Sequence, residues 1–157
     1  MSGFILNLST LPVGTCRVDA RALAAELDLT HAEWLGEVQA ELHVEKTGEL
    51  ITVRGPVRAT ARLECVRCLS GFDAPLEFDL QVVADRAGHA RGLEAELERD
   101  DYMMFHDGRQ IDLRENVREG LLLELPITPH CREACRGLCP KCGADLNEGP
   151  CGCAARE

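Results

Sequence analysis

Six of the nine cysteines lie in one C-terminal stretch, which reads Cys131-Arg132-Glu133-Ala134-Cys135-Arg136-Gly137-Leu138-Cys139-Pro140-Lys141-Cys142-Gly143 and, after a short turn, Cys151-Gly152-Cys153. Cysteine thiolates are the preferred structural ligands of zinc, which takes four of them in a tetrahedral arrangement. The same stretch has too few apolar side chains to form a core of its own. The sequence therefore predicts a metal-binding tail over residues 128–157, resembling a zinc knuckle and packed on the core of the chain.

One predicted zinc site lies wholly within this tail. Its four ligands are Cys139, Cys142, Cys151 and Cys153. In a zinc knuckle, backbone N–H groups hydrogen-bond the first sulfur, and a glycine such as Gly143 accepts the tight backbone that this requires. The alternatives are a redox-active CxxC pair or free thiols in a disordered tail. A thioredoxin-type dithiol needs a βαβ context and a helix N-terminus, and the tail offers neither.

A second predicted zinc site joins distant parts of the chain. The CxxC turn of Cys65 and Cys68 has no second CxxC near it, and Cys131 and Cys135 can complete its ligand set. The alternatives are that the first two are only packed thiols, or that the last two join the tail site. His130 is a substitute ligand, although a lone histidine beside a proline is more often on the surface. We therefore expect one or two zinc ions in closed sites, which scaffold and do not catalyse.

The composition limits the class of protein. A chain of 157 residues suits one domain with a small appendage, and no apolar run approaches the length of a membrane span. Residues 1–10 show neither a basic region nor a small-residue cleavage site, so we expect a cytoplasmic protein without a signal peptide. Cytosolic thiols stay reduced, which favours metal over disulfides. Eight ligands then leave Cys16 as a buried bystander.

The net charge of −10 opposes an extensive RNA-binding surface, because phosphates would be repelled. Arg54, Arg58 and Arg62 lie on one face of a predicted strand, but acidic residues on the neighbouring strands can pair with them. A basic protein partner is therefore favoured, with limited direct RNA contact. No motif places a nucleophile beside a base, so we expect neither catalysis nor a small-molecule substrate.

Alternation of apolar and polar residues dominates the first half of the chain. It extends over 37–45, 57–63 and 78–82, and residues 46–49 are typical of a hairpin turn. Such alternation indicates an antiparallel sheet with one buried face. We also expect a short strand over 4–8, a short helix from Asp19 to Leu27, and a mobile acidic loop over about 85–101.

The main helix is predicted from Asp112 to about Leu125, with Glu115 completing a capping box and Pro126 ending the helix. Its buried stripe is Leu113, Val117, Leu121 and Leu125. Together these patterns indicate an α+β fold, in which an antiparallel β-sheet is covered by one main helix. This core domain would occupy residues 1–127, and the cysteine-rich tail would follow it.

Three stretches carry a family resemblance. They are the strand and turn over Leu63–Leu69 with Phe72, the helix and its exit over Ile111–Ile127, and the cysteine string from Cys131 to Asn147 with Cys151 and Cys153. In these stretches the chain resembles the bacterial YceD family of large ribosomal RNA subunit accumulation proteins. The likeness covers about residues 60–153, and the tail string is its most specific part.

This resemblance implies a non-enzymatic ribosome-biogenesis factor of the bacterial cytoplasm. It would support the accumulation or processing of 23S rRNA and large-subunit assembly, through a ribosomal protein or a large-subunit assembly intermediate. No catalytic residue is carried over from the family. The rival hypotheses are a thiol-redox or RNA-processing enzyme, and a zinc-ribbon adaptor of the transcription type.

Overall fold

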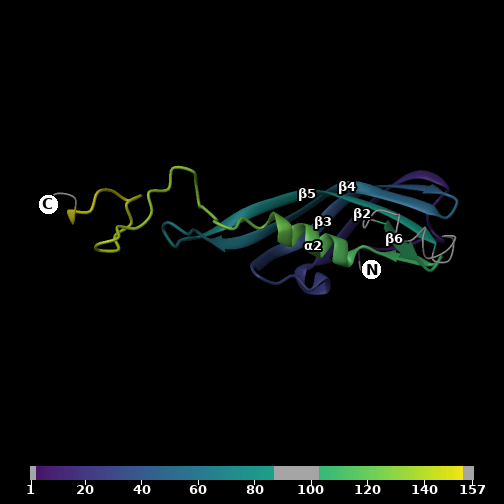
Figure 1. Ribbon diagram of the computed structural model, residues 1–157, viewed down its shortest axis with the longest axis horizontal. Coiled ribbons are helices and arrows are strands. Elements are labelled where there is room, and N and C mark those ends of the chain that lie inside the picture. Colours follow the sequence, from purple (N-terminus) through teal and green to yellow (C-terminus); the bar gives the residue numbers. More distant parts are fainter. Residues whose placement is uncertain (1–2, 87–102, 154–157) are drawn as a thin grey trace, which may run out of the picture.

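The computed structural model of the chain describes residues 3–86 and 103–153 (Figure 1). Its elements are, in chain order, β1 (Ile5–Asn7), β2 (Gly14–Leu23), the 3-10 helix η1 (Ala24–Leu27), β3 (Glu33–Thr47), β4 (Leu50–Glu64), β5 (Gly71–Arg86), β6 (Met103–His106), β7 (Gln110–Asp112) and α2 (Arg114–Glu124). Strands dominate, as the alternation predicted. In the part of the chain that the structure describes, no helix has the length and apolar character needed to span a membrane.

Among the described residues, the strands form two sheets. The main sheet has the order β2-β3-β4-β5-β6, and a separate small sheet pairs β1 with β7. Strands β2 to β5 are antiparallel, whereas β6 pairs with β5 in parallel. The predicted antiparallel sheet is therefore confirmed for the central strands, and the described residues form a mixed main sheet accompanied by the α-helix α2.

The long central strands determine where the cysteine turn lies. β3 and β4 are joined by the predicted hairpin turn, in which Gly48 adopts a φ of 62° that a side chain disfavours. β4 and β5 pair without interruption from Ile51 opposite Ala84 to Glu64 opposite Gly71. This uninterrupted pairing places the turn between Glu64 and Gly71 at the end of the sheet.

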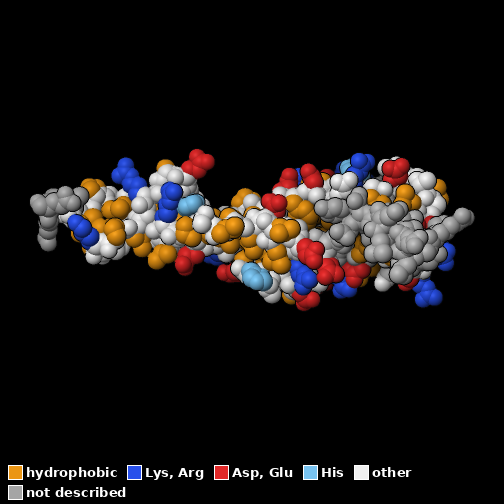
Figure 2. All heavy atoms as spheres, in the orientation of Figure 1, with side chains coloured by type: hydrophobic (Ala, Val, Ile, Leu, Met, Phe, Trp, Pro, Cys, Tyr) orange, Lys and Arg blue, Asp and Glu red, His pale blue; other side chains and the backbone are white. Residues whose placement is uncertain are grey.

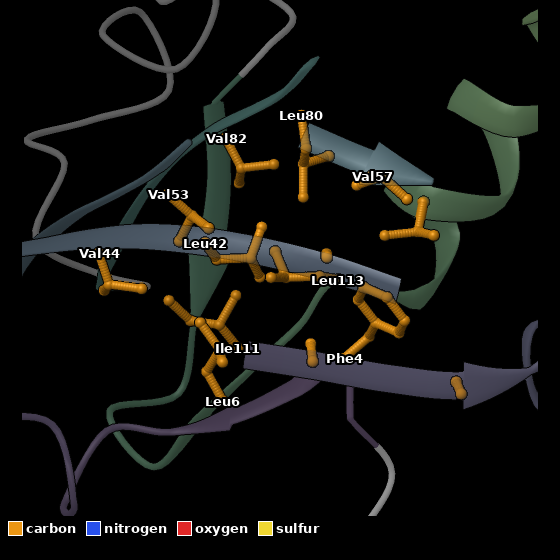
Figure 3. Close-up of a cluster of buried hydrophobic side chains, with 14 of the residues drawn as sticks. Phe4, Leu6, Leu42, Val44, Val53, Val57, Leu80, Val82, Ile111 and Leu113 are labelled. Carbon is orange, nitrogen blue, oxygen red and sulfur yellow. The ribbon is translucent and has the colours of Figure 1, made fainter. Parts of the chain in front are cut away.

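One face of the main sheet belongs to a hydrophobic core (Figure 3). Its buried side chains from the central strands include Val38, Ala40, Leu42, Val44, Val57, Ala59, Leu80 and Val82. The same core contains Phe4, Leu6, Ile111 and Leu113, which lie in or next to β1 and β7. Helix α2 adds Val117 and Leu121, and its main contacts are with β5 and η1. The short strand predicted over 4–8 is confirmed as β1, but β7 and its pairing with β1 were not predicted, because this pairing joins distant segments.

The helix predicted over 19–27 is wrong. β2 continues to Leu23, and only Ala24–Leu27 forms a short 3-10 helix. Ala20 and Ala22 are buried between exposed neighbours, which is the alternation of a strand paired with β3. Alanine is small and favours helices, so this alternation was masked in the sequence.

Helix α2 is confirmed, but its predicted cap is wrong. The N-cap is Leu113, which provides no side-chain cap. The carboxylate of Asp112 instead accepts hydrogen bonds from the backbone N–H and the guanidinium of Arg114, at 3.0 and 2.6 Å. The guanidinium of Arg114 also lowers the pKa of Asp112. Glu115 pairs with Arg118 at 3.5 Å and does not close a capping box.

Two predicted segments have different outcomes. Asp85 and Arg86, which were expected in a mobile acidic loop, belong to β5. The rest of that predicted loop lies outside the described residues.

Figure 1 shows the tail beyond the β4–β5 turn, at the end of the molecule away from β6, and a β-bridge joins its Leu138 to Asp145. The boundary between a domain over 1–127 and a tail over 128–157 stays a prediction.

Gly55 allows β4 to approach β3 closely. A Cβ atom at this position would lie 2.0 Å from the carbonyl oxygen of Glu41, a backbone atom that cannot rotate away. We expect Gly55→Ala to lower the free energy of unfolding by roughly 3 kcal/mol, measured by urea denaturation. The control is Gly48→Ala, where a Cβ atom meets nothing within 4 Å and only the left-handed backbone costs about 1 kcal/mol. Equal losses in the two variants would contradict the close approach.

Candidate metal centres

The turn between β4 and β5 presents two cysteines at the end of the hairpin. The N–H of Cys65 donates to the carbonyl oxygen of Ser70, and the N–H of Leu69 donates to the carbonyl oxygen of Cys65, each at 2.9 Å. Both Cys65 and Cys68 are buried. The turn therefore holds two thiols in fixed positions at the end of the sheet.

The segment after α2 brings two more cysteines to this turn. The N–H of Val66 donates to the carbonyl oxygen of Pro129 at 2.9 Å, and the guanidinium of Arg67 donates to that of Cys135 at 3.0 Å. We define the core cluster as Cys65, Cys68, Cys131 and Cys135, whose sulfur atoms all lie within 4.8 Å of one another. The structure thus gathers the four residues of the predicted long-range site.

The sulfur–sulfur distances in the core cluster fit tetrahedral coordination. The Sγ atoms of Cys65 and Cys135 are 3.7 Å apart, and so are those of Cys68 and Cys131. Zinc–sulfur bonds of about 2.3 Å place tetrahedral ligands about 3.8 Å apart. A disulfide bond would be about 2.05 Å long. The four residues are free thiols, and as a group they could hold a metal ion.

A second group of four cysteines lies wholly within the tail. We define the tail cluster as Cys139, Cys142, Cys151 and Cys153, whose sulfur atoms also lie within 4.8 Å of one another. The N–H of Cys139 donates to the carbonyl oxygen of Ala144, and the N–H of Gly143 donates to that of Cys139, each at 2.8 Å. Gly143 has a φ of 75°, which explains the glycine at this position. Cys139 is buried and Cys142 is exposed, so the tail cluster lies nearer the surface.

Each cluster contains a thiol that is readily deprotonated. Burial raises the pKa of Cys65, but hydrogen bonds from the backbone of Cys68 and Cys131 outweigh it and bring the pKa to about 6. In the tail cluster, the backbone of Cys142 helps to lower the pKa of Cys139 to about 6. By contrast, burial and the neighbouring thiols raise the pKa of Cys131 to about 12. Four thiolates need a cation between them, and a divalent metal ion supplies that charge.

Sequence reasoning missed two residues that support the core cluster. Asn147 lies in the loop of the tail cluster, and its Nδ2 donates to the Sγ of Cys135 at 3.4 Å. Arg67 lies within the first CxxC turn, and its guanidinium holds the carbonyl group of Cys135. Both are polar residues in irregular segments. No spacing in the sequence indicates the partner of either one.

Other candidate residues lie outside the clusters. His130 joins neither group of four cysteines. Cys16 lies in β2 outside both clusters and is half-buried against the hydrophobic core, so it is less buried than expected. On the exposed face of the sheet, Arg58 contacts both Glu77 and Glu41. This arginine is therefore paired with carboxylates, as expected from the acidic residues on the neighbouring strands.

Comparisons with known proteins add a family and several relatives. The family described as Large ribosomal RNA subunit accumulation protein YceD matches residues 53–157. An uncharacterized protein of Mycobacterium leprae is 32% identical over 120 residues, which cover 76% of this chain and 54% of the relative. An uncharacterized protein of Mycobacterium tuberculosis is 34% identical over 111 residues, which cover 70% and 52%. The chain thus spans about half the length of these curated relatives.

A plant relative carries the name of the same family. The Arabidopsis thaliana protein "Large ribosomal RNA subunit accumulation protein YCED homolog 1, chloroplastic" is 43% identical over 49 residues, which cover 31% of this chain and 15% of the relative. No solved structure matches the chain. The family match extends over two thirds of the sequence and includes every cysteine of the two clusters. This chain therefore belongs to the YceD family of large ribosomal RNA subunit accumulation proteins.

Proposed function

We propose that this chain is a non-enzymatic ribosome-biogenesis factor of the bacterial cytoplasm. It supports the accumulation or processing of 23S rRNA and the assembly of the large ribosomal subunit. The observation that carries this proposal is the family match over residues 53–157, which contains both cysteine clusters. The family is named for the accumulation of an RNA and not for a reaction.

We further propose that the core cluster and the tail cluster each hold a structural zinc ion. Four thiolates fill the coordination shell of zinc, so neither site keeps a position for water or substrate. In the core cluster, the ion would link the β4–β5 turn to the segment after α2. Structural zinc contributes about 10–16 kcal/mol of apparent binding free energy. That is more than the few apolar side chains of the tail can contribute to its folding.

The rival functions make different demands on the clusters. A thiol-redox enzyme needs a pair that alternates between dithiol and disulfide, whereas four converging sulfur atoms suit a metal ion. An RNA-processing nuclease needs an open metal site with carboxylates. In residues 3–86 and 103–153, the groups that could hold a metal consist of cysteines alone. A transcription-type adaptor shares the zinc, but the family match favours a ribosomal role.

The surface supports a basic protein partner. The net charge is −10, and Glu37, Glu45 and Asp79 on the main sheet are exposed without a cationic partner among the described residues. Hydrophobic side chains gather where α2 ends (Figure 2), and there Leu123 and Ile127 are 84% and 97% exposed. These exposed carboxylates, together with the apolar side chains at the end of α2, support a basic ribosomal protein or a large-subunit assembly intermediate as the partner, with limited direct RNA contact.

Zinc content tests the two metal sites. Protein purified without chelator should contain two zinc ions per chain by elemental analysis. Cys65→Ser should remove one ion and lower the free energy of unfolding by roughly 3 kcal/mol or more, since it breaks the core cluster. Cys16→Ser should keep both ions, because Cys16 lies outside both clusters. Zinc-free wild-type protein with an ordered tail would contradict the proposal of structural zinc and favour a redox role.

Ribosomal RNA levels test the biological role. Deleting the gene from the bacterium that encodes this chain should lower the ratio of 23S to 16S rRNA, measured by electrophoresis of total RNA. Wild-type protein supplied from a plasmid should restore the ratio, and so should the Cys16→Ser variant. An unchanged ratio in the deletion strain, under conditions in which the protein is normally made, would contradict the role.

Salt-dependent capture tests the partner. The immobilised chain should retain purified basic large-subunit ribosomal proteins at low salt and release them at about 1 M salt, where the Debye length is about 3 Å. Ile127→Ser should weaken capture about tenfold, as expected for an apolar side chain at the centre of an interface. The matched control is Val13→Ser, which changes a residue that is 82% exposed elsewhere. Equal capture by both variants would rule out the patch at the end of α2.

A further inference from the structure

One side chain from the loop of the tail cluster reaches the core cluster. Asn147 lies between Cys142 and Cys151 in the sequence, yet its Nδ2 donates to the Sγ of Cys135 at 3.4 Å. Its Oδ1 accepts a hydrogen bond from the backbone N–H of Arg136 at 2.9 Å. Because a backbone N–H can only donate, the amide oxygen faces Arg136 and the amide NH2 group faces the sulfur.

The loop that carries Asn147 has a defined conformation. The N–H of Asn147 donates to Oδ1 of Asp145, and the N–H of Leu146 donates to the carbonyl oxygen of Gly137, each at 2.9 Å. Two cysteines of the tail cluster stand at each end of this loop. A metal ion in the tail cluster would therefore join the ends of the loop and hold the Asn147 side chain in place.

A second connection joins the beginning of the tail cluster to the core cluster. The N–H of Leu138, next to Cys139, donates to the carbonyl oxygen of Arg67 at 3.0 Å. Leu138 also pairs with Asp145 in a β-bridge, which places the loop of Asn147 beside it. The guanidinium of Arg67 in turn donates to the carbonyl oxygen of Cys135 at 3.0 Å. The two clusters thus share a continuous set of hydrogen bonds.

We propose that Asn147 is a positioning residue of the core cluster and couples the two clusters, so that metal in one strengthens metal binding in the other. The proposal rests on the zinc sites proposed above. An N–H donor on a ligand sulfur stabilises the thiolate and fixes its direction, and such outer contacts change metal affinity about 10–100-fold. Because coupling between binding sites is reciprocal, each ion strengthens the other site by the same factor.

Variants of Asn147 in the full chain test the contact. Asn147→Asp keeps an oxygen for the N–H of Arg136 but replaces the donor to sulfur with a carboxylate oxygen, and Asn147→Ala removes both contacts. Glu148→Ala is the matched control from the same loop, because the described contact of Glu148 is a backbone hydrogen bond to Asp145. The probe is cadmium, for which 113Cd NMR resolves each cluster and chelator competition gives its affinity. Cys65→Ser and Cys142→Ser assign the two resonances.

Both Asn147 variants should weaken cadmium binding at the core cluster about tenfold or more and shift its resonance. The Glu148→Ala variant should match the wild type. Emptying the tail cluster with Cys142→Ser should weaken the core cluster by a similar factor, and Asn147→Asp should add little in that background. Far-UV circular dichroism checks that the sheet is intact in each variant, so that lost affinity is not mistaken for unfolding.

The outcomes separate this proposal from the zinc sites themselves. Two bound cadmium ions with an unchanged core affinity and resonance in Asn147→Asp would overturn the role of Asn147. An unchanged core affinity in Cys142→Ser would overturn the coupling. Wild-type protein that binds no metal would overturn the zinc sites first, and the coupling with them.

Discussion

The path of the chain after α2 depends on the convergence of four thiols from two distant segments. Cys65 and Cys135 are 70 residues apart in the sequence, and their sulfur atoms are 3.7 Å apart. This contact attaches the segment after α2 to the β4–β5 turn, with the backbone hydrogen bond from Val66 to Pro129 beside it. The position of the tail follows from this attachment, because the tail cluster begins four residues after Cys135.

The sheet could be predicted only where large apolar residues alternate. Val38, Leu42 and Val44 showed the period of β3 and are buried as expected. The period of β2 depends on Ala20 and Ala22, whose small side chains also suit a helix. The small sheet and the parallel pairing of β6 arise from contacts between distant segments. Local sequence patterns do not indicate such long-range contacts, so these pairings could not be predicted from the sequence.

The membership of the two clusters could be predicted because cysteine spacing carries strong chemical information. Two closely spaced pairs per site match the demand of zinc for four sulfur ligands. The supporting contacts could not be predicted in the same way. Asn147 and Arg67 each make single hydrogen bonds to Cys135, and these depend on how irregular segments cross in space. A substitute ligand role for His130 was a reasonable hypothesis, but the cysteines alone complete both groups.

The cysteines of the core cluster become available at different times during synthesis of the chain. Cys131 leaves the ribosome 63 residues after Cys68, so a nascent chain exposes half of the cluster as a bare dithiol. If the core cluster holds an ion as proposed, the four-cysteine site cannot be completed until Cys131 and Cys135 have been synthesised. A product truncated before Cys131 would lack two of the four cysteines of the core cluster. Its β4–β5 turn would stay without the C-terminal segment, and we expect quality-control proteases to degrade such a product more readily.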